Sequence, residues 1–211
     1  MFDLGNLLVG FRGVEAIGEW LGEGESAALW ERWLASPAVR AFERGREDAG
    51  SFARSLVAEL DLPLDPGEVL DQIAGWITGP TPGAVELLDE LRELGEGRPS
   101  VACLSNTNPV HWPLLHESLG DRFDHLFLSH RTGLVKPDPA AFDQVPAALG
   151  LPASRVLFFD DQPTNVRAAR ARGLAAEQAT SPADCRRLLV ARGVLRERGL
   201  AGTYSPLGTA P

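Results

Sequence analysis

Lysine is almost absent from this chain of 211 residues, although basic side chains are not. Of the 20 basic residues 19 are arginine, and Lys136 is the only lysine. Methionine and tyrosine occur once each, isoleucine three times and asparagine four times, a bias that is typical of a GC-rich genome. Lys136 and the four asparagines are therefore the first residues to locate in the predicted fold.

Cysteine is also scarce, and its positions exclude two kinds of site. Cys103 and Cys185 have neither metal-ligand spacing nor a secreted disulfide framework around them, so reduced thiols are expected. The sequence lacks a run of the ~18 apolar residues that a membrane span needs. Residues 1–11 contain Asp3 instead of the basic start of a signal peptide. We therefore expect a cytoplasmic protein.

Positive charge is in deficit, since 29 acidic residues against 20 basic ones give a net charge of -9. Without a basic cluster, this balance argues against a nucleic-acid or anionic-membrane partner. It leaves open a small anion held in a local site. A hydrophobic fraction of 44% with 23% charged residues is ordinary for a globular protein.

From residue 80 onward, short apolar runs alternate with segments of helical period. The runs at 100–104, 123–128, 155–159 and 174–177 predict strands, and the segments at 82–94, 109–119, 138–149 and 164–172 predict helices. This alternation indicates an α/β fold with a Rossmann-like, doubly wound parallel sheet. Ligands of such folds bind at the carboxyl ends of the strands.

Residues 13–79 show a different pattern, which predicts an inserted, all-helical cap. Helices are expected at 14–21, 26–34, 37–44, 49–60 and 67–77, and no strand is expected there. Residues 1–12 and 80–195 then form the α/β core, and 196–211 a flexible tail rich in Gly, Pro, Thr and Ser. The first strand is so short before Asp3 that the natural start is expected a few codons earlier.

Four of the five tryptophans lie in the predicted cap, and two uses for them remain open. They could fill a small helical core or provide an aromatic platform for a substrate. These residues are Trp20, Trp30, Trp33 and Trp76.

The scarce residues all follow predicted strands. Asn6 comes after Asp3, Asn106 and Asn108 come after Ser105, Lys136 follows the next strand, and Asn165 follows Asp160 and Asp161. Each alone is explained as a turn, a helix cap or a surface charge. Together, three carboxylates at one edge of a sheet would repel one another unless a cation lay among them. Mg²⁺ and Lys136 would supply that charge and could hold a phosphoryl group against a carboxylate nucleophile.

These motifs resemble those of the haloacid dehalogenase-like (HAD) hydrolase superfamily, with a helical cap inserted after the first motif. The matching segments begin at Phe2 (FDLGN), Leu104 (LSNTN), Val135 (VKPDP) and Phe158 (FFDD). These variants, and the cap segment Phe42-Glu43-Arg44-Gly45, are most similar to α-D-glucose-1-phosphate phosphatases and the phosphatase domain of soluble epoxide hydrolases.

The resemblance implies a Mg²⁺-dependent phosphatase that acts on a small phosphorylated metabolite, a sugar phosphate being one candidate. It implies that Asp3 is the nucleophile and forms an aspartyl-phosphate, while Lys136 balances charge. The other implied roles are Mg²⁺ binding by Asp3, the Gly5 carbonyl and Asp161, phosphate binding by Ser105 and Asn106, and orientation of these groups by Asp160 and Asn165.

One departure from the superfamily pattern concerns proton transfer. Most phosphatases of the superfamily carry a second Asp two residues after the nucleophile, as general acid, where this chain has Gly5. His111 is a candidate substitute, or else simply a residue at the start of a helix. The missing acid keeps two alternatives open: a metal-independent 2-haloacid dehalogenase, since halide departs without a proton, and a binding or scaffold protein that retains the fold.

Overall fold

Parallel strands form the centre of the described chain, which comprises residues 1–22 and 27–197 of a computed structural model. Strand β3 (Ala102–Ser105) pairs with β4 (His125–Leu128), and β5 (Leu157–Asp160) pairs with β6 (Ala175–Gln178), both in parallel. Phe2 joins the two pairs by bridging Cys103 on one side and Phe159 on the other. The residues before Asp3 therefore lie in the middle of the sheet, so Asp3 emerges at its carboxyl edge.

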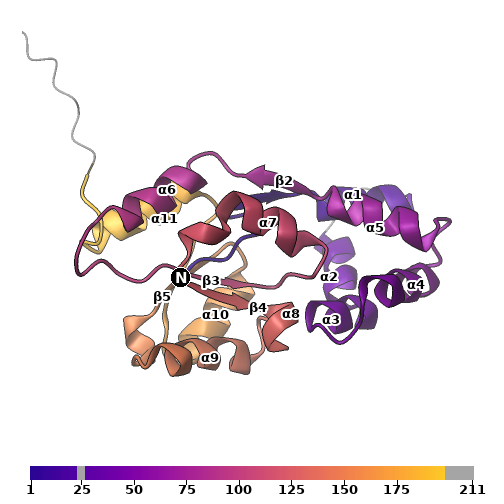
Figure 1. The fold of residues 1–211 in the computed structure, drawn as a ribbon. Coiled ribbons are helices and arrows are strands. Elements are labelled where there is room, and N and C mark those ends of the chain that lie inside the picture. Colours follow the sequence, from indigo (N-terminus) through magenta and orange to yellow (C-terminus); the bar gives the residue numbers. More distant parts are fainter. Residues whose placement is uncertain (23–26, 198–211) are drawn as a thin grey trace, which may run out of the picture.

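Helices cover both faces of this sheet, as Figure 1 shows. On one face lie α6 (Ala84–Arg92), α7 (His111–Leu119) and α11 (Pro182–Ala191), and on the other α9 (Pro139–Leu149) and α10 (Pro163–Ala171). Each face has its own apolar core, since Leu88 belongs to one cluster of buried residues and Phe142 to the other. The predicted α/β fold with a parallel sheet is confirmed.

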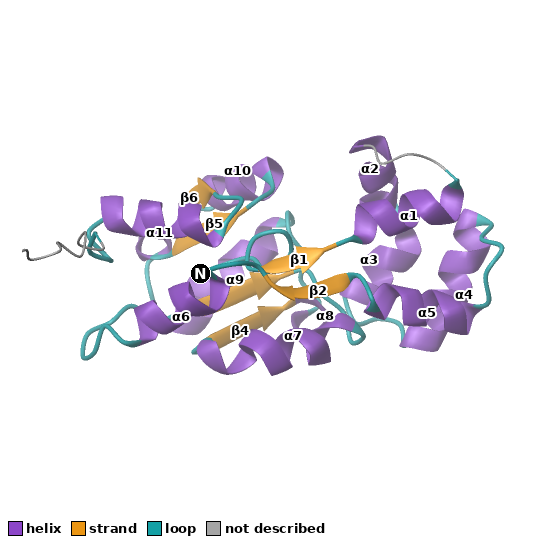
Figure 2. Ribbon diagram, turned by 90° about the horizontal axis from the view of Figure 1, so that it is seen from above, coloured by secondary structure: helices purple, strands orange, loops and turns teal. Residues whose placement is uncertain are grey.

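The cap lies at one end of the sheet and is joined to it by a two-stranded ribbon (Figure 2). Strand β1 (Val9–Phe11) pairs antiparallel with β2 (Ile77–Pro80). Between them run α1 (Gly13–Leu21), α2 (Ala27–Ala35), α3 (Pro37–Glu43), α4 (Ala49–Leu60) and α5 (Pro66–Ala74). They bury a third apolar cluster, in which the rings of Phe42 and Phe52 stack 4.1 Å apart.

The prediction of a strand-free segment at 13–79 was wrong at its end. Helix α5 stops at Ala74, and β2 begins at Ile77, inside the segment that was predicted as a helix. Gly79 has a φ of 97°, which disfavours other residues and a continued helix. Burial alternates along β2, but over four residues this period is too short to distinguish from a helical one.

Some elements were not predicted from the sequence, and one predicted segment lies mostly outside the described residues. Helix α11, whose N-cap Ser181 accepts a hydrogen bond from the Asp184 N–H, was not anticipated, and neither was the short α8 (Ser129–Thr132). The predicted flexible tail at 196–211 lies outside the described part of the chain from residue 198 onward.

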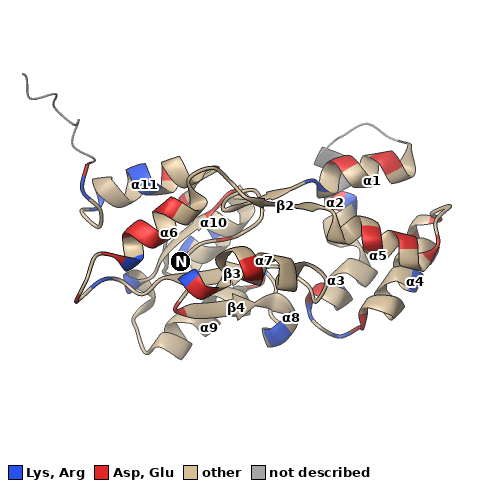
Figure 3. Ribbon diagram, turned by 45° about the horizontal axis from the view of Figure 1, so that its top comes forward, with Lys and Arg blue, Asp and Glu red and all other residues tan. Residues whose placement is uncertain are grey.

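Charges of both signs are interspersed along the outer helices (Figure 3). On α6 and α11, for example, Glu90 and Arg186 face each other, with Arg186 Nη2 2.7 Å from Glu90 Oε1. Within residues 1–22 and 27–197, no helix is both long and apolar enough to cross a bilayer.

Candidate active site

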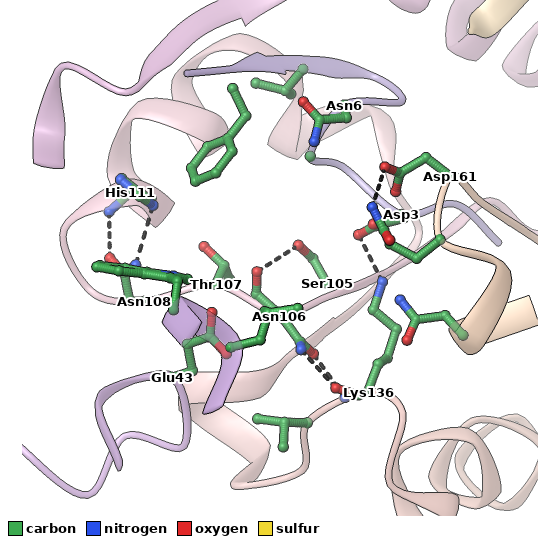
Figure 4. Close-up of a pocket in the computed structure, with 18 of the residues that line it drawn as sticks. Asp3, Asn6, Glu43, Ser105, Asn106, Thr107, Asn108, His111, Lys136 and Asp161 are labelled. Carbon is green, nitrogen blue, oxygen red and sulfur yellow. Dashed lines mark hydrogen bonds and ion pairs between the residues drawn. The ribbon is translucent and has the colours of Figure 1, made fainter. Parts of the chain in front are cut away.

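A cavity of about 190 Å³ lies where the cap meets the carboxyl ends of the strands. All five of the scarce residues located from the sequence line it: Asn6, Asn106, Asn108, Lys136 and Asn165. So do Asp3, Gly5, Ser105 and Asp161. Figure 4 shows that Asp3, Lys136 and Asp161 lie on one side and the cap residue Glu43 on another. The residues predicted from separate loops therefore share one cavity, with the exception of Asp160, which lies behind it.

The lysine is the electrostatic centre of the cluster. Lys136 Nζ lies 2.8 Å from Asp3 Oδ1 and 2.7 Å from Asp160 Oδ2, and only 2% of its side chain is exposed. Burial alone would lower the pKa of Lys136, but Asp160 and Asp3 raise it above the ordinary value. The ammonium is therefore a permanent positive charge beside the Asp3 carboxylate.

Asp160 anchors this lysine and has no oxygen left for another ligand. It is fully buried, and besides Lys136 it accepts hydrogen bonds from Asn165 Nδ2 at 3.0 and 3.1 Å and from the Gln162 N–H at 2.8 Å. Asn165 occupies the first turn of α10, directly after the strand that carries Asp160. Asn165 thus holds Asp160, and Asp160 contacts Lys136, while the orienting role that the resemblance implies for both stays a prediction.

Asp3 and Asp161 provide the oxygens that remain for a cation. One carboxylate oxygen each from Asp3, Asp160 and Asp161 lies within 4.8 Å of the others. Burial raises the pKa of Asp3 despite Lys136, and burial together with Asp160 raises the pKa of Asp161. The Gly5 carbonyl accepts no backbone hydrogen bond within the described chain. Hard oxygen donors around concentrated negative charge fit Mg²⁺.

The turn after Asp3 exposes its carboxylate to the cavity. Asn6 has a left-handed φ of 56°, a conformation that Asn tolerates better than most residues. The chain folds back so that the Leu4 carbonyl accepts hydrogen bonds from Leu7, Leu8 and Val9. A Cβ added at Gly5 would meet no atom within 4 Å, so packing does not account for this glycine.

The side chain of Asn106 is engaged with the backbone of Lys136. Its Nδ2 donates to the Lys136 carbonyl at 2.9 Å, and its Oδ1 accepts from the Lys136 N–H at 2.8 Å. This two-sided clamp positions the backbone of Lys136, and the second N–H of the Asn106 amide makes no other hydrogen bond within the described chain. Ser105, buried at the end of β3, makes only a 3.4 Å contact with the Asn106 carbonyl, so its hydroxyl is available to a ligand.

Several polar residues of the cavity were not identified from the sequence, among them Thr107 and Glu43. Thr107 is buried and its Oγ1 has no hydrogen-bond partner within the described chain, whereas its backbone is held by Ser129 Oγ through two 2.9 Å bonds. Glu43 ends helix α3 and also lines the cavity. The motifs contained both residues, but no periodicity could show where their side chains point.

His111 is neutral and both of its nitrogens are engaged. Nε2 lies 2.8 Å from the Ile73 carbonyl, which can only accept, so Nε2 carries the hydrogen. Nδ1 accepts from Asn108 Nδ2 at 3.1 Å, and Asn108 Oδ1 accepts from the His111 N–H at 2.9 Å, which fixes the orientation of the amide. Burial lowers the pKa of His111. Of the two interpretations, the helix-start residue agrees with the structure, since His111 begins α7.

Aromatic residues of the cap form another wall of the cavity. Trp33 and Trp76 are buried within the cap cluster and also line the cavity, with their ring centroids 5.0 Å apart. Trp20 packs against the same cluster, and the side chain of Trp30 lies outside the described part of the chain. Trp33 and Trp76 therefore fill the core of the cap and also border the cavity, and their use as a platform for a substrate stays a prediction.

The chain matches the model of a hydrolase family and is similar to two curated proteins that are named as phosphatases. The description of the matching family, over residues 5–173, is haloacid dehalogenase-like hydrolase. Glyceraldehyde 3-phosphate phosphatase of Pyrococcus abyssi is 30% identical over 115 residues, 51% of this chain and 47% of that protein. Phosphatase MT3486 of Mycobacterium tuberculosis is 30% identical over 152 residues, 70% of this chain and 68% of that protein. The chain thus spans about half of the first relative and two thirds of the second.

Solved structures share the fold at low identity. A HAD family enzyme of Bacteroides thetaiotaomicron, in complex with magnesium and inorganic phosphate, is 21% identical with a TM-score of 0.67, over 84% of this chain and 91% of that one. The L-2-haloacid dehalogenase of Xanthobacter autotrophicus is 25% identical with a TM-score of 0.61, over 92% and 83%. Similarity at this level of identity shows the fold, and it does not distinguish a phosphatase from a dehalogenase.

Proposed function

We propose, from the premise that this chain belongs to the haloacid dehalogenase-like hydrolase family, that it is a Mg²⁺-dependent phosphatase of a small phosphate ester. The observation that carries the proposal is the contact of Lys136 Nζ with Asp3 Oδ1 at 2.8 Å, at the edge of a cavity that Asp161 also lines. A carboxylate nucleophile for an anionic phosphoryl group needs such a neighbour, because attack otherwise meets charge repulsion.

The first step, formation of an aspartyl-phosphate, uses Asp3, Lys136 and Ser105 in different roles. A carboxylate oxygen of Asp3 attacks phosphorus, the bond from phosphorus to the ester oxygen breaks, and an aspartyl-phosphate forms. Lys136 offsets the charge on Asp3 and the phosphoryl group, and the Ser105 hydroxyl donates to a phosphoryl oxygen. Asp160 holds the ammonium of Lys136 directly, and Asn106 holds the backbone of the same lysine.

Mg²⁺ would be held by Asp3, Asp161 and the Gly5 carbonyl, and it would supply Lewis-acid polarisation of the phosphoryl oxygens. Without a cation, burial and then the neighbouring carboxylates raise the pKa values of Asp3 and Asp161 and so favour their neutral forms. Support for phosphate chemistry also comes from the phosphatase names of the two curated relatives. Among candidate substrates, the resemblance to glucose-1-phosphate phosphatases favours a sugar phosphate.

Removing the metal is expected to reduce phosphate release roughly 10²- to 10³-fold, which corresponds to several kcal/mol of charge stabilisation. The experiment measures phosphate from a panel of phosphate esters, and chloride from 2-chloropropionate, after treatment with a chelator and after Mg²⁺ is restored. Recovery of phosphate release by Mg²⁺ is the expected result.

Two other outcomes correspond to the alternatives. Chloride release that is independent of metal, without phosphate release, would make the chain a dehalogenase, a chemistry to which Gly5 presents no obstacle. Absence of both products, together with no detectable Mg²⁺ binding in calorimetry, would identify a binding or scaffold protein.

A further inference from the structure

The leaving group of a phosphate ester needs a proton that position 5 cannot supply. An alkoxide is a poor leaving group, and a positioned acid typically contributes ~10²- to 10⁴-fold to such a step. Gly5 has no side chain, although the space beside it is open. The proton must come from another group that lines the cavity, if the enzyme acts on esters of ordinary alcohols.

Most titratable groups of the cavity cannot serve as this donor. The hydrogen of His111 is held by the Ile73 carbonyl, and the raised pKa of Lys136 keeps its protons in place. An arginine such as Arg40 does not deprotonate in proteins. Asp161 must be ionised if it binds Mg²⁺. Among the titratable residues that line the described cavity, this leaves Glu43.

Three neighbouring contacts fix Glu43 over the site. Phe42 is buried in the cap cluster and stacks on Phe52, which anchors the end of α3. Arg44 Nη2 pairs with Asp138, two residues after Lys136. Gly45, with a left-handed φ of 65°, lies so close to the core that an added Cβ would be 2.1 Å from the His130 carbonyl. Glu43 is thus held between a cap anchor and two contacts with the core.

The carboxyl of Glu43 faces the cavity without a partner. Figure 4 shows it reaching toward Asn106 and Thr107, across the cavity from Asp161. Within the described chain it has no hydrogen bond and no ion pair, although Arg44 beside it has one. A half-buried carboxyl that is left unpaired in a cavity is available to a ligand atom.

We propose that Glu43 is the general acid and base of the reaction, in the role that Gly5 leaves vacant. When an Asp3 oxygen bonds to phosphorus and the ester bond breaks, the Glu43 proton passes to the leaving oxygen and gives the free alcohol. Water then attacks phosphorus, the bond from phosphorus to Asp3 breaks, and a proton of the water returns to Glu43. Ester and water become alcohol and phosphate, and both carboxyl groups are regenerated. This inference rests on the proposed phosphatase function.

The protonation of Glu43 suits this role near neutral pH. Burial raises the pKa of Glu43 to about 7, against the opposing effects of Lys136 from the core and of Arg40 and Arg44 on either side in the cap. An acid that must be protonated is active below its pKa. We therefore expect kcat/KM for an alkyl phosphate to fall as pH rises through about 7.

The test is Glu43→Gln, assayed on a simple alkyl phosphate and on 4-nitrophenyl phosphate, whose acidic phenol leaves without a proton. We expect kcat/KM to fall ~10²- to 10⁴-fold for the alkyl ester and less than ~10-fold for the nitrophenyl ester. The fall of activity above neutral pH should also disappear. Glu19→Gln, the same change at an exposed position of cap helix α1, serves as the matched control and should leave both rates unchanged.

Three outcomes would count against the proposals, and they are separable. Equal losses on the two substrates would overturn proton donation by Glu43, because a defect in binding or folding weakens both reactions. Equal phosphate release by the wild type and by Asp3→Asn would instead overturn the assignment of Asp3 as the nucleophile, and absence of phosphate release from the wild type with Mg²⁺ would overturn the phosphatase function itself. Thermal unfolding of Glu43→Gln, expected within a few degrees of the wild type, shows whether the variant folds.

Discussion

Asp3→Asn is expected to fold normally and to lose phosphate release on the order of 10⁴- to 10⁶-fold, the range that follows removal of a nucleophile or of its direct partner. The amide has nearly the shape of the carboxylate but is far less nucleophilic. The loss should be equal for alkyl and nitrophenyl esters, because both depend on the attack at phosphorus. Steady-state phosphate release over a wide range of enzyme concentration measures it.

The fold is expected to survive because Asp3 is held mainly by its backbone. Its N–H donates to the Phe159 carbonyl at 2.9 Å, which the substitution does not touch. Lys136 keeps its second partner, Asp160, at 2.7 Å. Burial raises the pKa of Asp3, so replacing the carboxylate with a neutral group removes an unfavourable buried charge.

Asp121→Asn is the matched control, since Asp121 is exposed and distant in sequence from the site motifs. It should retain both the unfolding midpoint and the turnover of the wild type. If Asp3→Asn instead released phosphate as fast as this control, Asp3 would not be the nucleophile, and another carboxylate, Asp161 first, would have to be tested.

The loops that build the site could be predicted from the sequence because of a rule about parallel sheets. Strands that run in parallel bring their carboxyl ends to one edge, so Asp3, Lys136 and Asp161 could be placed together without knowing any side-chain contact. The partner of the Asn106 amide could not be foreseen. It is the backbone of Lys136, 30 residues away, and a backbone group leaves no mark in the sequence.

The position of Glu43 depends on how the cap docks on the core, which periodicity does not encode. The end of α3 faces the cavity because Arg44 pairs with Asp138 and because Gly45 permits a close approach to His130. Each contact joins residues that are far apart in the chain. The similarity of Phe42-Glu43-Arg44-Gly45 to a known subgroup marked the segment but gave no direction to its side chains.

The lone lysine leads to a prediction about stability as well as turnover. Lys136→Met leaves the fully buried Asp160 without its cation, a change that typically costs ~3–5 kcal/mol of unfolding free energy. Because the side chains of Lys136 and Asp160 are 2% and 0% exposed, solvent does not screen their interaction. Phosphate release should fall as well, since the charge beside Asp3 is lost. Urea unfolding followed by fluorescence measures the change in stability.

The stability deficit of Lys136→Met should depend on pH. The pKa of Lys136 is raised in the folded chain, so its contribution is complete below the ordinary lysine value and is lost only as pH rises beyond it. Burial raises the pKa of Asp3 to about 7 although Lys136 lowers it, so the pKa of Asp3 should rise further without the lysine, and the deficit should grow as pH rises above about 7. Arg172→Met is the control: it breaks a surface pair with Asp143, whose side chains are 44% and 46% exposed, and should lower the free energy of unfolding far less than Lys136→Met does.

Lys136→Arg tests whether the site needs a lysine or only a positive charge. A guanidinium is planar and larger, whereas Lys136 Nζ lies between two carboxylates and 5.4 Å from the centre of the Phe158 ring. Fitting it there should cost about 1–3 kcal/mol and displace Asp3 enough to lower turnover. Arginine fills 19 of the 20 basic positions. A physical reason for the lysine at position 136 therefore requires that arginine there lowers turnover. Turnover equal to that of the wild type would show that the lysine is a coincidence of composition.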